Sequence, residues 1–167
     1  MDPYGELLLI IAAPSVLPLL GAMVGPFAGV AAMFIGLQLA LGRSEPWLPR
    51  RLRNRMTQGR LAIRLGIWIQ RRLRPFSRFP VPRYPRILAG STAAWSGLLL
   101  ALPLPVIPFA NVVPALALGL VGAGLMARKD LFGWIGTALS GGFTLLVLSF
   151  AGAVVAALRR LLVAGLP

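Results

Sequence analysis

Side chains that could do chemistry are scarce in this sequence. Its 167 residues include no cysteine and no histidine, so thiol nucleophiles, histidine bases and zinc or haem sites are excluded together. The four acids, Asp2, Glu6, Glu45 and Asp130, all lie outside the long uncharged stretches. A coupled-ion site would need a carboxylate inside such a stretch, and acid–base catalysis lacks an evident pair of side chains. We therefore expect no enzymatic activity, no catalytic residue, no metal and no cofactor.

Two amides and three prolines form a candidate polar path. Gln38 and Asn111 are the only amide side chains within the uncharged stretches, where a polar group needs a partner. Each either bonds a neighbouring helix or lines a path for a polar solute. Pro26 and Pro108 stand where a new helix would begin, and Pro114 follows the second of them. Free amide donors at such helix starts favour anions or polar oxygens.

Three uncharged stretches must position these residues: 7–42, 87–127 and 131–158. Each exceeds the ~20 apolar residues that span a bilayer. Apolar residues make up 57% of the chain and its mean hydropathy is +0.81, which is typical of a membrane protein. We therefore expect an all-α, multi-pass membrane protein. Its serines and threonines in these stretches are expected to bond carbonyls of their own helices.

The positive charge is concentrated between the first two stretches. The chain has a net charge of +13, and residues 43–86 alone hold 13 of the 16 arginines and a net charge of +12. The positive-inside rule places this block on the cytoplasmic face. Nucleic acid is not an expected partner, because membrane topology and anionic lipid explain the charge.

Residues 57–74 within this block predict an amphipathic helix. Arg60, Arg64 and Arg71 share one face, opposite an apolar stripe. The helix either lies among anionic lipid headgroups, with these arginines as the lipid-binding residues, or packs on the protein's own cytoplasmic side.

Short loops outside that helix carry opposite charges at close spacing. Arg43 with Glu45, and Arg128 with Asp130, predict loop ion pairs. Exposed pairs of this kind contribute about 0–1 kcal/mol.

The two halves of the chain resemble each other. Residues 26–28 recur as 108–110, and residues 71–73 recur as 159–161. Residues 1–80 thus form a first repeat, with a hairpin over 6–42 and the basic amphipathic segment over 43–80. Residues 81–167 form a second, with a hairpin over 87–127 and a transmembrane helix over 131–158. Each hairpin has a proline elbow, which either re-enters the bilayer or turns at the far interface, because residues 27–41 reach only about 22 Å as a helix.

Glycines in the second repeat are spaced for close helix packing. They include Gly122, Gly124, Gly133 and Gly136. This packing occurs either within one chain or between the chains of a homodimer.

Two segments, 36–49 and 102–115, resemble the ExoD family of bacterial membrane proteins. They read GLQLALGRSEPWLP and LPLPVIPFANVVPA. The first elbow, residues 17–21, lacks the second proline that the family usually has. The resemblance implies a bacterial inner-membrane protein linked to exopolysaccharide synthesis, without assigned catalytic residues. The expected function is that of a small transporter or channel for an anionic or polar solute. The alternative is a non-transporting accessory or scaffold protein of exopolysaccharide assembly that binds anionic lipid.

Overall fold

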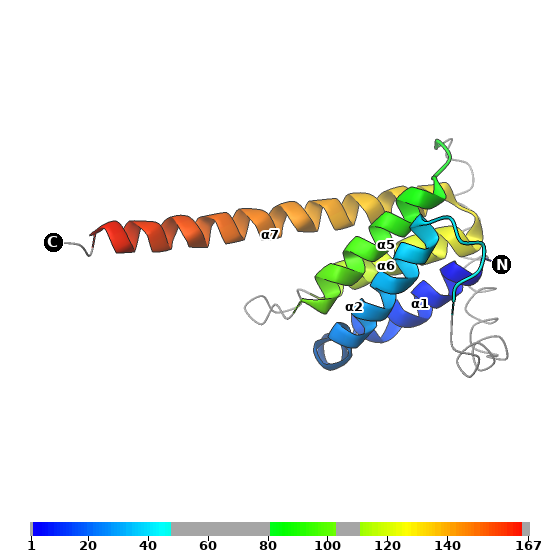
Figure 1. The fold of residues 1–167 in the computed structure, drawn as a ribbon, viewed down its shortest axis with the longest axis horizontal. Coiled ribbons are helices and arrows are strands. Elements are labelled where there is room, and N and C mark those ends of the chain that lie inside the picture. The colour runs from blue at the N-terminus through cyan, green and yellow to red at the C-terminus, as the bar shows by residue number, and fades with distance from the viewer. Residues whose placement is uncertain (1, 48–80, 103–110, 165–167) are drawn as a thin grey trace.

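The computed structural model describes residues 2–47, 81–102 and 111–164, and these ranges are helical with short connections. Figure 1 shows a bundle of helices and one long helix that extends beyond it. The helices are α1 (Pro3–Val16), α2 (Pro18–Ala40), α5 (Arg86–Ala101), α6 (Val112–Ala127) and α7 (Asp130–Ala164). The all-α prediction is confirmed for the described ranges, which contain no strand.

Helices α1 and α5 end in the same way. Leu17 after α1 has φ −75° and ψ 122°, and Leu102 after α5 has φ −71° and ψ 125°. Each leucine precedes a proline in the sequence. Proline disfavours helical backbone at the residue before it, so both helices stop there.

Helices α2 and α6 also share an ending. Gly42 and Arg128 have positive φ values of 75° and 53°. The next residue in each case donates its backbone N–H back into the helix: Arg43 to the Gln38 carbonyl at 3.2 Å and Lys129 to the Gly124 carbonyl at 2.9 Å. This six-residue closure is the Schellman motif, which satisfies carbonyls that the helix end would leave unpaired.

The prediction that a new helix begins at Pro26 is wrong. Helix α2 begins at Pro18, and Pro26 lies inside it. Pro26 cannot donate to the carbonyl four residues earlier and its ring crowds that carbonyl, which bends the helix. Figure 1 shows the first turns of α2 nearly end-on, while the rest of the helix runs across the view. The matching Pro108 lies outside the described residues.

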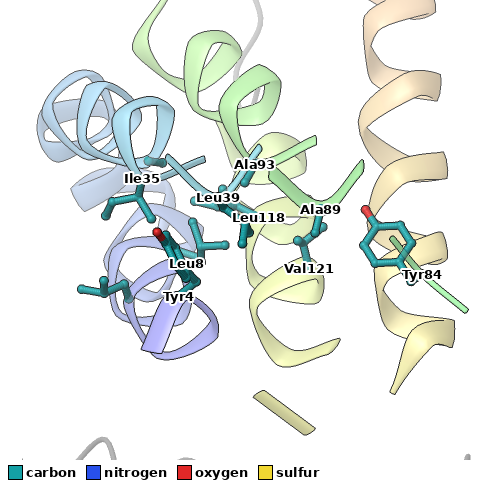
Figure 2. Packing of buried hydrophobic residues seen from close by; sticks show 12 residues of the cluster. Tyr4, Leu8, Ile35, Leu39, Tyr84, Ala89, Ala93, Leu118 and Val121 are labelled. Atoms are coloured by element: carbon teal, nitrogen blue, oxygen red, sulfur yellow. The ribbon is translucent and has the colours of Figure 1, made fainter. Parts of the chain in front are cut away.

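Each helix of the first hairpin, α1 and α2, packs mainly against a helix of the second hairpin, α5 and α6. Helix α2 lies along α5, and α1 lies along α6. Their shared core is apolar and includes Leu8, Leu39, Ala93, Leu118 and Val121 (Figure 2). Each of these five side chains is fully buried.

Glycines allow the paired helices to approach closely. A Cβ atom added at Gly5 of α1 would lie 2.6 Å from the Gly122 carbonyl oxygen of α6. One added at Gly97 of α5 would lie 2.6 Å from the Met33 nitrogen of α2. Gly136 of α7 packs against the Ala117 carbonyl in the same manner. The prediction that Gly122 and Gly136 serve close packing is therefore confirmed within the chain.

Helix α7 runs without a break through Gly141 and Gly142. Its 35 residues give a length of about 52 Å. Among the side chains described along it, which reach residue 160, Phe143 is the last buried one, and residues 148–160 are all exposed. Two described segments are long and apolar enough to cross a membrane: Met23–Ala40 and Asp130–Arg160.

Candidate functional site

Charged side chains gather at one end of the bundle, which we call the charged end. Here α1, α5 and α7 begin and α2 and α6 end (Figure 1). Within the described ranges, Arg159 and Arg160 near the far end of α7 are the exceptions. The residues of the charged end are Asp2, Glu6, Arg43, Glu45, Arg83, Arg86, Arg128, Lys129 and Asp130.

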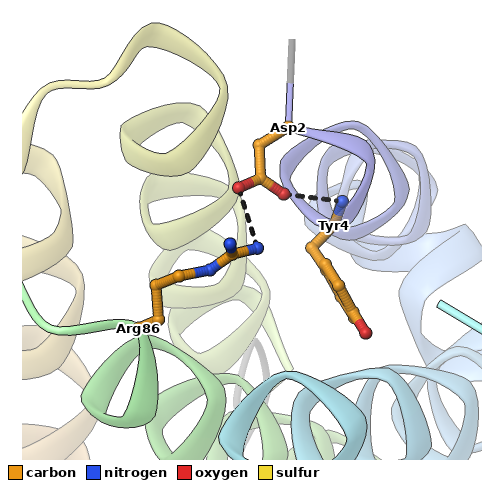
Figure 3. Close-up of polar contacts among 3 residues, drawn as sticks. All are labelled: Asp2, Tyr4 and Arg86. Atoms are coloured by element: carbon orange, nitrogen blue, oxygen red, sulfur yellow. Dashed lines mark hydrogen bonds and ion pairs between the residues drawn. The ribbon is translucent and has the colours of Figure 1, made fainter. Parts of the chain in front are cut away.

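Asp2 connects the starts of the two hairpins (Figure 3). One carboxylate oxygen accepts the Tyr4 backbone N–H at 3.1 Å, which caps α1. The other oxygen pairs with the Arg86 guanidinium at 3.1 Å, and that guanidinium lies 6.0 Å from the centre of the Tyr4 ring. Because Arg86 is half-exposed, the ion pair contributes about 0–1 kcal/mol. It therefore aligns α1 with α5 more than it stabilises them.

The Tyr4 hydroxyl is buried at this place. Among the groups that the structure describes, it has no hydrogen-bond partner. An unpaired buried hydroxyl costs about 1–3 kcal/mol. The apolar ring compensates by filling space in the core cluster that also contains Leu8 and Leu39.

Asp130 ties the segment before α5 to the start of α7. Its carboxylate accepts the Tyr84 backbone N–H at 3.0 Å. The Tyr84 ring packs directly on Gly133, where any side chain would collide with it. Trp134 meets this ring edge-on at 5.4 Å and donates its indole N–H to the Pro82 carbonyl at 3.0 Å.

A hydroxyl seam joins α5 to α7, beginning at Tyr84. The Tyr84 hydroxyl lies 2.6 Å from the Thr137 hydroxyl and 3.3 Å from that of Thr92. Thr92 and Thr137 also bond each other at 3.0 Å. Deeper along the seam, Ser96 and Ser140 bond at 2.9 Å, and both are buried.

The seam ends where the Trp95 indole N–H donates to Thr144 at 2.8 Å. The predicted bonds to helix carbonyls do form for Thr137, to Gly133, and for Thr144, to Ser140. The hydrogen bonds between α5 and α7 were not predicted from the sequence. The spacing of the serines and threonines could have indicated them, because residues three or four positions apart share a helix face.

The structure does not bring Gln38 and Asn111 together. The Gln38 side-chain oxygen accepts the Trp47 backbone N–H at 2.6 Å, a local bond at the charged end. The Asn111 amide nitrogen would lie 3.0 Å from a Cβ atom on Gly25, near the other end of α2. Gly25 and Gln38 are thirteen residues apart on α2, or roughly 20 Å along an α-helix. The two amides therefore belong to different places in the bundle.

The remaining predicted positions are distributed as follows. Pro114 is buried in the first turn of α6, where a missing N–H costs nothing. Pro108, Arg60, Arg64 and Arg71 lie outside the described residues.

Neither predicted loop ion pair forms among the described residues. The ion pair at the charged end instead joins Asp2 to Arg86, as shown above. Asp130 is engaged by the Tyr84 N–H, and Arg128 adopts the left-handed conformation that closes α6.

Comparison of the sequence with known protein families identifies the family of this chain. The family model described as "Exopolysaccharide synthesis, ExoD" matches residues 2–149, which include all of α1, α2, α5 and α6 and over half of α7. The chain belongs to the ExoD family. A relative from Synechocystis sp., described as an uncharacterized protein, is 29% identical over 138 residues. This alignment covers 77% of the present ExoD chain and 63% of the relative, so the chain spans less than two thirds of that protein. No solved structure matches the present chain.

Proposed function

We propose that this ExoD-family chain is an integral protein of the bacterial inner membrane and serves exopolysaccharide synthesis as a non-transporting scaffold. The observation that carries the scaffold role is the interior of the bundle. It is filled by close backbone contacts and apolar side chains, and the hydroxyls of the seam between α5 and α7 bond one another.

Membrane insertion is supported by the outer surface. Large apolar side chains point outward from α2 and α7, including Phe27 at 80% exposure, Met23 at 77% and Leu145 at 68%. An apolar surface of this extent is stable against lipid and costly in water. The charged end would then lie at a membrane surface.

The arginine block sets the proposed orientation. Residues 48–80 contain ten arginines and no acid, and they connect the end of α2 to the start of α5. Both of these positions lie at the charged end. The positive-inside rule therefore orients this end toward the cytoplasm, where the block would meet anionic lipid headgroups.

The polar groups inside the bundle support a structural role. Ser96 and Ser140 are buried and bond each other, and the Tyr84, Thr92 and Thr137 hydroxyls form a closed set. Between membrane helices such bonds act as glue, each contributing about 0.6–2 kcal/mol. A conduit would instead require polar groups that face a solute.

A transporter or channel for an anionic or polar solute is the second candidate. It is favoured by the helix breaks at Leu17 and Leu102, which occur at equivalent points of the two hairpins and opposite the charged end. Interrupted helices at corresponding positions of two repeats often mark substrate sites in transporters.

Flux measurements separate the two functions. The purified full-length chain would be reconstituted into liposomes loaded with a small anionic dye or a neutral sugar. A scaffold gives the same leak rate as protein-free liposomes. Saturable flux that depends on the protein, and that is lost in Asn111→Leu, would establish the transporter instead.

A further inference from the structure

We propose that both hairpins end inside the bilayer and that α7 alone crosses it, with its far half surrounded by lipid acyl chains. This inference rests on the membrane insertion proposed above. It goes further by assigning a depth to each helix and a side to the far end of α7.

Three arms of the two hairpins, α1, α5 and α6, are shorter than the hydrocarbon core. Helix α1 has 14 residues, and α5 and α6 have 16 each, which gives about 21–24 Å. Helix α2 has 23 residues, or about 35 Å, but Pro26 bends it, and the part after Pro26 measures about 21 Å. The hydrocarbon core is about 30 Å thick. Figure 1 also shows these helices inclined to α7, which reduces their depth further.

The length of helix α7 matches the thickness of a bilayer with its headgroups. Asp130 at its start and Arg159 near its end are 29 residues apart, or about 44 Å along the helix. No charged residue lies between them. A bilayer with its headgroups measures about 40–45 Å. The two charges would therefore lie in opposite headgroup layers.

The bundle stops covering α7 at the depth where the hairpins end. Phe143, the last buried residue among the described side chains of α7, is about 20 Å from Asp130 along the helix. The far ends of α1 and α5 carry the exposed apolar residues Leu17, at 53%, and Leu102, at 45%. Residues 7–42 and 87–127 contain no charge, so neither hairpin brings a charged side chain to a far membrane surface.

Lipid is the occupant that fits the exposed half of α7. Every residue from 148 to 160 is exposed, and all of them except Ser149, Arg159 and Arg160 are apolar, so no side of this half is covered by the protein. A second copy or another helix would cover one side and leave the opposite side bare. Acyl chains cover all sides at once.

Thiol labelling tests these depths, because the chain has no native cysteine. Single cysteines would replace Ser44, Leu17, Leu102 and Arg160, all exposed positions, in the full-length protein in cells. A membrane-impermeant maleimide should label Arg160→Cys from the periplasm and Ser44→Cys only when the cytoplasmic face is opened. Leu17→Cys and Leu102→Cys should react from neither side and should react fully after denaturation in detergent.

Other outcomes overturn the inference. Labelling of Leu17→Cys or Leu102→Cys from the periplasm would show that a hairpin crosses the membrane, and labelling of Arg160→Cys from the cytoplasm would show that α7 does not. A disulfide between two copies of Val155→Cys in membranes would replace lipid with a second chain. Release of the wild-type chain by an alkaline carbonate wash would instead refute membrane insertion itself.

Discussion

Gly36 of α2 lies backbone to backbone against Gly90 of α5, and Gly122 of α6 makes the same contact with Gly5 of α1. Gly122 follows Gly36 by 86 residues, and Gly90 follows Gly5 by 85. The helix ends at Gly42 and Arg128 repeat with the same offset of 86. Glycines at equivalent positions of the two hairpins thus make equivalent contacts, which supports the proposed internal repeat. Because both hairpins start at the charged end, the repeat would be parallel and not inverted.

The first prediction concerns these glycine contacts. Gly90→Ala should lower the free energy of unfolding by about 1–3 kcal/mol, because the added methyl group would collide with the Ala40 backbone. Gly141→Ala is the matched control, since nothing lies within 4 Å of its Cβ position. It should raise stability by about 0.5–1 kcal/mol through helix propensity. Unfolding of the purified protein in detergent measures both, and equal effects would argue against the close packing.

A second prediction concerns the hydroxyl seam. In a double-mutant cycle, Ser96→Ala and Ser140→Ala should show a coupling free energy of about 0.6–1.7 kcal/mol, because the two hydroxyls bond each other. Ser149→Ala provides the control, since Ser149 is exposed and bonds only the Leu145 carbonyl of its own helix. A coupling free energy of zero would mean that the two hydroxyls do not bond each other and that α5 and α7 do not meet at this depth.

Asp130 allows a third test. Asp130→Ala removes the acceptor of the Tyr84 N–H and an acid from the first turn of α7, and should cost about 1–2 kcal/mol of stability. Glu45→Ala also removes one acid from the charged end, but from an exposed position without a described bond, so its effect should stay within about 0.5 kcal/mol. Thermal denaturation in detergent compares them. Similar losses from both variants would mean that net charge matters more than the bond to Tyr84.

The fourth prediction concerns anionic lipid at the arginine block. Each basic residue near a charged leaflet contributes about 1 kcal/mol, so replacing Arg60, Arg64 and Arg71 together by Gln should remove most of the preference for such lipid. Replacing the same three by Lys should keep it, because the charge is retained. Mass spectrometry of the lipids that copurify with each full-length variant gives the ratio of phosphatidylglycerol to phosphatidylethanolamine. An unchanged ratio in the Gln variant would assign the block a role other than lipid binding.

The sequence predicted where a helix begins or ends when a charged residue or a proline marks that position. An uncharged stretch beginning at residue 87 became α5, which begins at Arg86, and residues 131–158 lie within α7. The position of the first break was mispredicted, because Pro18 and Pro26 both suit a helix start and only packing decides between them. The breaks follow Leu17 and Leu102, where the next residue is proline.

The functional residues were harder to predict. A serine or threonine in an apolar helix can satisfy itself on its own helix, so the sequence does not say which of them face a partner. Ser96 and Ser140 became a pair only because α7 crosses α5 at that point. Gln38 was conspicuous as a polar residue in an apolar stretch, yet it bonds the Trp47 N–H only nine residues away.

The central claim is that the chain serves exopolysaccharide synthesis as a scaffold without a polar path for a solute. The most direct measurement is exopolysaccharide yield in a strain that lacks the gene and is complemented with full-length variants at equal membrane levels. The double variant Gln38→Leu, Asn111→Leu should restore the yield of the wild type, because neither amide serves a solute. A yield that stays at the level of the deletion strain, with the double variant folded and present in the membrane, would contradict the scaffold and establish a path through these residues.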